Sequence, residues 1–134
     1  MVADLRLGFF EDFKGADTVL LSGSVLGIRN LVGRIRAFAA SSEQELPIHE
    51  FAAVSAHQPA KLFVVRTPRT SGGAGNASFA WVCPPLEIED VLGMLSAIAE
   101  RGLGHHYFDL LASEVQLIVS VGEYDDPWWS RRDG

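Results

Sequence analysis

Histidine and carboxylate side chains are the groups of this chain best suited to metal chemistry. His49 and His106 begin segments that we predict to be equivalent strands, and His105 directly precedes His106. Glu50 and Asp109 lie close to them in sequence, and histidine–carboxylate sets bind transition metals. Their spacing matches no established ligand motif, and neighbouring residues of a strand point to opposite faces of its sheet. We therefore predict no metal site and no cofactor.

Cys83, the only cysteine of the chain, is a candidate nucleophile. It directly precedes Pro84 and Pro85 at a predicted helix N-terminus, where a thiol that faces the helix has a lowered pKa. No histidine or aspartate is spaced to activate it. We favour a buried structural cysteine and predict no catalytic residue.

A glycine-rich loop, residues 68–77 (PRTSGGAGNA), follows a predicted strand, as phosphate-binding loops do. Another predicted strand follows this loop instead of a helix, and the Gly-Lys-Ser/Thr of a P-loop is missing. We therefore predict a flexible connecting loop that binds no nucleotide.

Two amphipathic helices are predicted to position these groups. Residues 86–101 (LEIEDVLGMLSAIAER) repeat residues 26–41 (LGIRNLVGRIRAFAAS) sixty positions later in the chain. In both segments apolar residues recur at i, i+3, i+4 and i+7, which is typical of a helix with one buried face. Gly102 is a natural C-cap for the second helix.

Predicted strands give each half of the chain the order strand–helix–strand–strand. We therefore predict a single α+β domain over residues 1–134, built from two tandem βαββ repeats at about 18–67 and 78–122. The repeats are expected to form a mainly antiparallel sheet with the two helices packed on one face. The strands are expected at residues 4–10, 18–22, 48–54, 61–67, 78–83, 105–111 and 115–122.

A Gly-x-x-x-Ala pair lies on the back of each predicted helix, away from the sheet. A glycine in the middle of a helix lowers helix stability by about 1 kcal/mol relative to alanine. Because a glycine stands at the same position of both helices, we expect another surface to pack closely there. Arginines flank the first pair and acidic residues the second, which favours association of oppositely charged faces. An ordinary solvated face is the other interpretation. The predicted contact, with a protein partner or with a second copy in a homodimer, comprises Arg29, Gly33, Arg36, Ala37, Gly93 and Ala97.

The C-terminal tail, residues 123–134 (EYDDPWWSRRDG), contains the adjacent pair Trp128 and Trp129. Tryptophan is enriched in the hot spots of protein interfaces, so the pair is a candidate contact for a partner. Two exposed tryptophans lower solubility, so the tail could equally fold back onto the sheet or the helices. Both interpretations stay open.

Length and composition limit the classes of protein to which the chain could belong. At 134 residues with 48% hydrophobic residues, one domain can bury a sizeable core without disulfides. The formal net charge of −6 argues against binding to nucleic acid. No apolar stretch approaches the roughly 20 residues of a membrane span, and the N-terminus lacks a secretory pattern. A single cysteine allows no internal disulfide, which fits a reducing compartment. We therefore predict a soluble cytoplasmic protein without a membrane partner.

The first half resembles a family of small bacterial immunity proteins that neutralise polymorphic toxins. The resemblance lies in LLSGSVLGIRNLVGRIRAFAA, then PIHEF, then KLFVV, and it covers about 50 residues. It implies a non-enzymatic protein that binds a partner protein. The second half departs from the pattern, with Val82 and Cys83 in place of Ser22 and Gly23, and no functional residue carries over.

Two functions follow as alternatives. The leading prediction is a small non-enzymatic protein-binding module, immunity- or antitoxin-like, whose partner is unknown. The alternative is a small-molecule-binding or enzymatic domain with a pocket between the sheet and the C-terminal tail. The residues of that alternative site would be His49, Trp81, His106, Tyr107 and Asp109.

Overall fold

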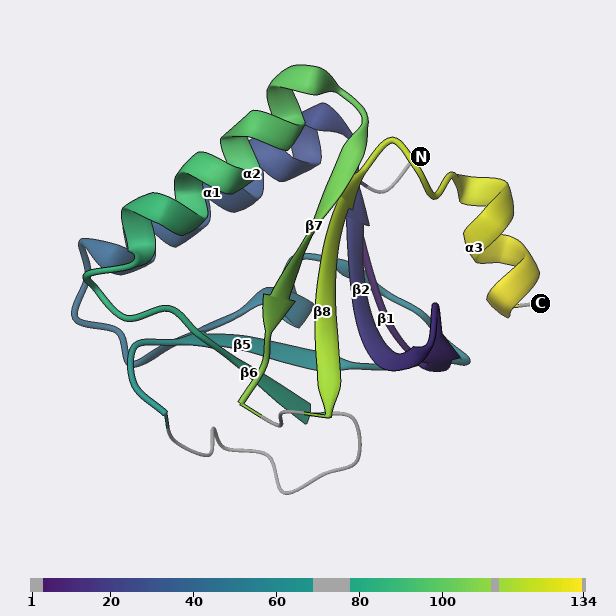
Figure 1. Ribbon diagram of the computed structural model, residues 1–134, viewed down its shortest axis with the longest axis horizontal. Helices are drawn as coiled ribbons and strands as arrows, with labels where there is room; N and C mark the ends of the chain where they lie inside the picture. The colour runs from purple at the N-terminus through teal and green to yellow at the C-terminus, as the bar shows by residue number, and fades with distance from the viewer. Residues whose placement is uncertain (1–3, 69–77, 112–113, 134) are drawn as a thin grey trace.

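The computed structural model describes residues 4–68, 78–111 and 114–133, and within them the chain is a mixed α+β fold (Figure 1). Most of the predicted glycine-rich loop, residues 69–77, lies outside the described residues. The helices are α1 (Val25–Ala39), α2 (Ile88–Arg101), α3 (Asp126–Asp133) and the short 3-10 helix η1 (Ile48–Glu50). The strands are β1 (Leu5–Phe13), β2 (Ala16–Gly23), β3 (Glu45–Pro47), β4 (Ala53–Val54), β5 (Lys61–Val65), β6 (Ser78–Val82), β7 (Gly104–Asp109) and β8 (Val115–Val121).

Local signals in the sequence define the ends of the two long helices. Ser24 caps α1, because its Oγ accepts a hydrogen bond of 3.0 Å from the backbone N–H of Gly27. Gly102 ends α2 in the left-handed conformation with φ of +73°, which confirms the predicted C-cap. The helix begins at Ile88, two residues later than predicted, because the backbone N–H of Glu87 closes a turn onto the carbonyl of Pro84.

The strands form two sheets, so the prediction of one mainly antiparallel sheet is wrong. The larger sheet has the order β4-β1-β2-β8-β7 and the smaller sheet the order β3-β5-β6. Three pairs are parallel: β1 with β4, β2 with β8, and β5 with β6. The physical reason is that each long helix carries the chain from one sheet to the other. A strand that precedes a helix therefore pairs with a strand from the other half of the chain.

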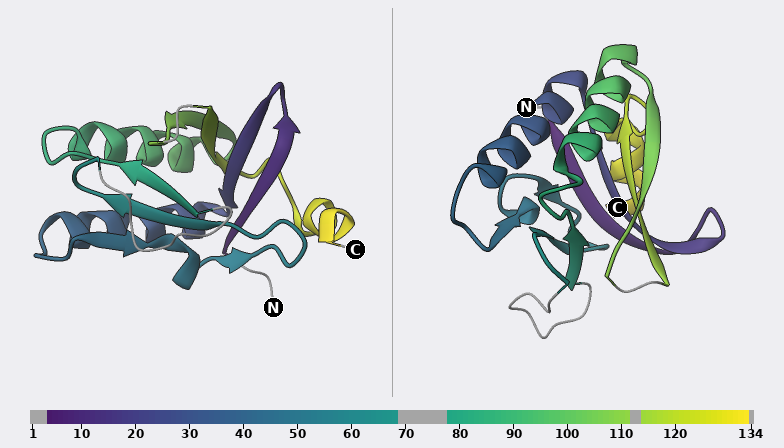
Figure 2. Two further views of the ribbon diagram at one scale, coloured as in Figure 1. Left: turned by 90° about the horizontal axis from the view of Figure 1, so that it is seen from below. Right: turned by 60° about the vertical axis from the view of Figure 1, so that its left-hand side comes forward.

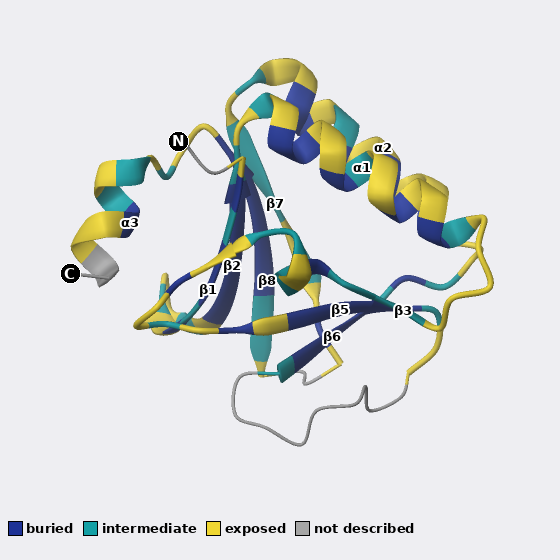
Figure 3. Cartoon of the chain, turned by 180° about the vertical axis from the view of Figure 1, so that it is seen from behind, coloured by how far each residue is buried: buried dark blue, intermediate teal, exposed yellow. Residues whose placement is uncertain are grey.

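Alternation along the strands buries both faces of the larger sheet. Val19 and Leu21 of β2 face the main core, which α1 and α2 complete with their apolar stripes. Leu20 faces the opposite side, where α3 covers the sheet. The two long helices lie side by side over one side of the sheets, with their buried residues turned inward (Figures 2 and 3).

The C-terminal tail is the helix α3 in the described residues, and it folds back onto the larger sheet. Trp129 is only 1% exposed, and its Nε1–H donates a hydrogen bond of 3.0 Å to Oγ of Ser22. Trp128 is half-buried, with its ring 5.5 Å from that of Phe10. Arg6 and Asp126 form a salt bridge of 2.6 Å that ties the start of α3 to β1. Of the two interpretations of the tail, the core position therefore holds for Trp129.

The prediction of a strand over residues 48–54 is wrong, because this segment forms η1 and the two-residue strand β4. The buried Ile48 anchors the turn, and Nδ1 of His49 accepts a hydrogen bond of 3.2 Å from the backbone N–H of Leu62. This contact with β5 holds the turn in place, whereas the segment around His106 forms the regular strand β7. The predicted equivalence of the two segments therefore does not extend to their secondary structure.

Candidate functional site

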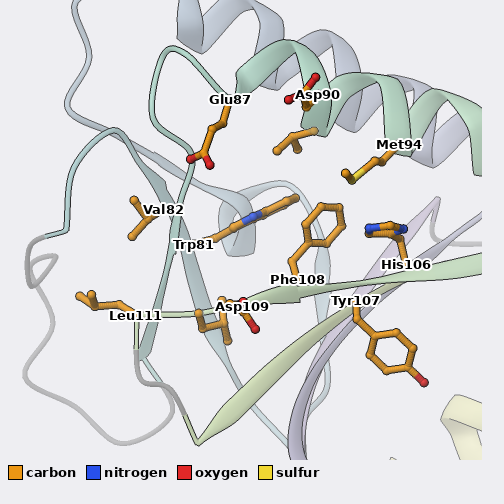
Figure 4. A pocket seen from close by; sticks show the side chains of 12 residues that line it. Trp81, Val82, Glu87, Asp90, Met94, His106, Tyr107, Phe108, Asp109 and Leu111 are labelled. Atoms are coloured by element: carbon orange, nitrogen blue, oxygen red, sulfur yellow. The ribbon is translucent and has the colours of Figure 1, made fainter.

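A pocket of about 550 Å³ lies between α2 and two edge strands, β6 of the smaller sheet and β7 of the larger one (Figure 4). The two sheets meet just beyond β7, where the backbone N–H of Leu111 donates a hydrogen bond of 2.9 Å to the carbonyl of Ala80. From that point they diverge beneath α2. The residues that line the pocket are Trp81, Val82, Glu87, Asp90, Val91, Met94, His106, Tyr107, Phe108, Asp109, Leu110 and Leu111.

Three aromatic rings form the inner wall of the pocket. Trp81 is only 1% exposed, and the centroid of its ring lies 4.9 Å from that of Phe108. The ring of His106 lies 4.8 Å from Phe108 on the other side. His106 and Phe108 share one face of β7 because they are two residues apart in a strand. Met94 points from α2 toward these rings, so the wall is apolar and aromatic (Figure 4).

Among the described residues that line the pocket, the charged side chains other than His106 are all carboxylates. Glu87 and Asp90 come from the start of α2, and Asp109 comes from the end of β7. The side chain of Glu87 points into the space beside Trp81 (Figure 4). No lysine or arginine is present among the described lining residues. The pocket therefore presents a negative potential next to aromatic faces, an environment that favours a cation.

The structure brings together four of the five residues predicted for a ligand site, namely Trp81, His106, Tyr107 and Asp109. This pocket lies against α2. A smaller pocket, of about 240 Å³, does lie between the larger sheet and the C-terminal tail, where we predicted the site, but none of the five predicted residues lines it. Tyr107 lines the pocket, but its ring points to the other side of β7 (Figure 4). The centroid of this ring lies 5.2 Å from that of the His105 ring.

His49 lies elsewhere, with its ring 4.8 Å from Phe63 and Nδ1 bonded to the backbone of Leu62. Glu87, Met94 and Phe108 also line the pocket but were not among the predicted site residues. The period of two along β7 could have identified Phe108, because it shares a strand face with His106.

A polar cluster lies at the other end of β7. Oε1 of Glu123 accepts hydrogen bonds of 2.9 Å from Nδ1 of His105 and of 2.6 Å from Oγ of Ser120. Partial burial raises the pKa of Glu123, but the hydrogen bonds from Ser120 and His105 outweigh it and the net pKa lies below the usual value. Because the serine donates to the carboxylate and not to the histidine, this geometry does not activate a nucleophile.

Cys83 is fully buried at the end of β6, as the sequence analysis favoured. Burial, together with the nearby charge of Glu87, raises the pKa of its thiol to about 12. The sulfur is therefore protonated at neutral pH and is a poor nucleophile. Among the described residues, no group of three or more histidine, cysteine, aspartate or glutamate side chains is placed to hold a metal ion.

The backs of α1 and α2 are exposed, so both the predicted contact surface and an ordinary solvated face stay open. A side chain at Gly33 or Gly93 would meet nothing within 4 Å beyond the helix itself. The two helices are bridged there by Arg36 and Glu89, whose charged atoms lie 3.7 Å apart. Other predicted contact residues on these exposed faces are Arg29, Ala37 and Ala97. Trp128 keeps part of its surface accessible, whereas the indole of Trp129 is out of reach of a partner.

Comparison with known proteins gives no relative from which a function could be transferred. No protein-family model, curated protein or solved structure matches the chain. The described helices include none that is both long and apolar enough to cross a membrane. The function must therefore be argued from the site itself.

Proposed function

We propose that this chain is a small non-enzymatic protein-binding module, immunity- or antitoxin-like in its action, and that the pocket between α2, β6 and β7 receives the partner protein. The observation that carries the proposal is the combination of an aromatic wall with the carboxylate of Glu87 directed into one open concave surface. Aromatic groups framed by polar ones are characteristic of the energetic centre of a protein interface.

Exposed apolar side chains around the pocket support a protein partner. Met94 and Leu111 line it and are 40% and 44% exposed. Leu86 is 97% exposed and directly precedes the lining residue Glu87. Apolar side chains that gather at one surface lose contact with water when a partner covers them. The partner is expected to be basic, since the chain carries a formal net charge of −6.

The state of the most reactive side chains supports binding rather than catalysis. The thiol of Cys83 is buried with a raised pKa, and the hydroxyl of Ser120 donates to Glu123. The thiol is protonated and buried, and the hydroxyl is engaged in this hydrogen bond, so neither group is poised to attack a substrate.

A small-molecule site is the second candidate, favoured by the size of the pocket. At about 550 Å³ it falls within the range of roughly 300–1,000 Å³ that ligand sites occupy. Trp81 at its wall and His106 beside it are the first residues to test for this alternative. In this case a metabolite, and not a protein, would raise the melting temperature of the chain.

We also infer that the two halves are related units, as the sixty-residue repeat suggests. The first strand of each half pairs in parallel with the last strand of the other half, β2 with β8 and β6 with β5. The long helix of each half then crosses to the opposite sheet. This reciprocal exchange of strands supports a common origin, although the described residues before β8 contain no counterpart of η1.

The test replaces the two exposed apolar residues at the edge of the pocket, Met94 and Leu111, which we call the apolar rim, and leaves the core unchanged. The variant Met94→Ser/Leu111→Ser is compared with Leu26→Ser/Leu103→Ser, whose leucines are 66% and 61% exposed outside the pocket lining. A tagged full chain is used to isolate its partner from the native host, and the dissociation constants are then measured with purified proteins. Loss of two rim contacts should weaken binding by about 2 kcal/mol, or roughly thirtyfold.

The control variant should bind as the wild type does. Equal binding by all three chains would refute the pocket as the contact. A partner that is lost instead with Ala97→Arg would place the contact on the back of α2.

A further inference from the structure

An arginine of the first half shows the kind of contact that the pocket offers. The guanidinium carbon of Arg34, on α1, lies 4.2 Å from the ring centroid of Phe51. A guanidinium at this distance over an aromatic face is a cation–π contact. The first half of the chain therefore places a cation between its long helix and an aromatic residue that follows it.

The corresponding place in the second half lacks this cation. Met94 stands sixty positions after Arg34 in the repeated helix. In sequence, Phe108 of His106-Tyr107-Phe108 aligns with Phe51 of His49-Glu50-Phe51, although Phe51 follows η1 and Phe108 lies in β7. Met94 and Phe108 line the same pocket, so helix and aromatic residue again face each other, now across an open space.

The second half also carries negative charge where the first has none. At the sixty-residue offset, Asn30 corresponds to Asp90 and Gly27 corresponds to Glu87. Both carboxylates line the pocket. The second half thus has the aromatic wall and two additional anions but a neutral residue in place of the arginine.

We propose that the pocket takes an arginine side chain of the partner protein, with its guanidinium over Phe108 beside Trp81 and its N–H groups directed at Glu87. This inference rests on the proposed protein-binding function and names the group that the site recognises. Arginine fits better than lysine, because its planar and weakly hydrated cation stacks on aromatic rings and also forms paired hydrogen bonds to carboxylates.

A protein side chain is favoured over a free small molecule by the rim. Met94 and Leu111 leave 40% and 44% of their surfaces exposed at the edge of the pocket. A protein that inserts an arginine would cover these apolar groups with its own surface, whereas a molecule confined to the pocket would leave them in water.

The first test titrates the full-length ¹⁵N-labelled chain with the blocked peptide acetyl-Ala-Arg-Ala-amide and follows the indole N–H signal of Trp81. The same peptide with citrulline keeps the shape of the arginine side chain but lacks its positive charge. The same peptide with lysine keeps the positive charge but lacks the planar guanidinium group. We expect saturable shifts at Trp81 and along β7 with arginine, at least tenfold weaker binding with lysine, and no saturable shift with citrulline. Equal responses to arginine and citrulline would overturn the inference. Free L-arginine that binds tenfold more tightly than the peptide would also overturn it, in favour of a small-molecule site.

The second test fills the pocket from within. Met94→Arg should place the chain's own guanidinium over Phe108, as Arg34 is placed over Phe51, and should abolish the response to the arginine peptide. Ala97→Arg adds the same charge one turn along α2 on its exposed back and should bind the peptide as the wild type does. An amide spectrum that remains dispersed shows that each variant is folded. Peptide binding by folded Met94→Arg at wild-type strength would refute the inference.

The outcomes separate this inference from the proposed function. If the partner is lost with Met94→Ser/Leu111→Ser but the arginine peptide does not bind, the pocket is a protein contact and the arginine inference is wrong. If the peptide binds while the rim variant retains its partner, recognition of arginine is supported and the pocket is refuted as the partner's contact.

Discussion

Replacement of Trp129 by alanine tests whether the C-terminal helix is part of the core. The indole is 1% exposed, lies 5.7 Å from the ring of Phe10, and donates its N–H to Ser22. Truncation of a buried tryptophan to alanine costs about 3–5 kcal/mol, through lost burial and the cavity that it leaves. For a domain of typical stability, about 5–15 kcal/mol, this is a large fraction of the free energy of unfolding.

Urea denaturation followed by circular dichroism measures the effect. With a slope of about 2 kcal/mol per molar urea, the midpoint of Trp129→Ala should fall by about 2 M. Ser22→Ala isolates the hydrogen bond, because it leaves the indole N–H buried without an acceptor, and should cost about 1–3 kcal/mol. Trp128→Ala is the matched control: its side chain is half-buried, so the loss should be distinctly smaller. An unchanged midpoint for Trp129→Ala would refute the packing of α3 on the sheet.

Three further predictions concern backbone conformation and ionisation. Gly33→Ala should stabilise the fold by about 0.5–1 kcal/mol, because this position is helical and open to solvent. Gly102→Ala should destabilise the fold by about 1 kcal/mol, because φ at this position is +73°. Thermal unfolding should show a higher melting temperature for the first variant and a lower one for the second. Because the pKa of the Cys83 thiol is raised in the folded protein, its contribution to stability is fully present below the ordinary thiol pKa near 9. This contribution should be lost as pH rises toward about 12. Cys83→Ala should remove this pH dependence from the urea midpoints measured between these values. Because the pKa of Glu123 is lowered in the folded protein, its carboxylate contributes stability above the ordinary pKa near 4.5, and this contribution is lost as pH falls through the folded-state pKa. Glu123→Gln should therefore reduce the fall of the urea midpoint at acidic pH. An unchanged fall would contradict the role of this carboxylate.

The helices could be predicted from sequence because their signals are local. The apolar spacing, the Ser24 cap and Gly102 all lie within or beside the segments that they define. Most strand segments were predictable for the same reason, since alternation identifies a buried face. Alternation does not identify the neighbouring strand, however. Thr18 of β2 lies beside Gln116 of β8, 98 positions away, and no local pattern encodes that pairing.

The remaining errors also come from contacts between distant parts of the chain. Residues 48–50 form a turn because His49 bonds to the backbone of Leu62, thirteen positions later. Trp129 is buried because Ser22 and Phe10 lie beneath it. The pocket was partly predictable: Trp81 and His106 stood out as aromatic and polar groups, but their position under α2 depends on how the two sheets diverge.

The central proposal is that the pocket between α2, β6 and β7 binds a partner protein. The most direct measurement is the dissociation constant of the isolated partner for wild type, Met94→Ser/Leu111→Ser and Leu26→Ser/Leu103→Ser, determined by calorimetry. We predict binding weakened by roughly thirtyfold for the first variant and unchanged for the second. Unchanged binding by the first variant, with or without a loss in the second, would show that the pocket is not the contact with the partner.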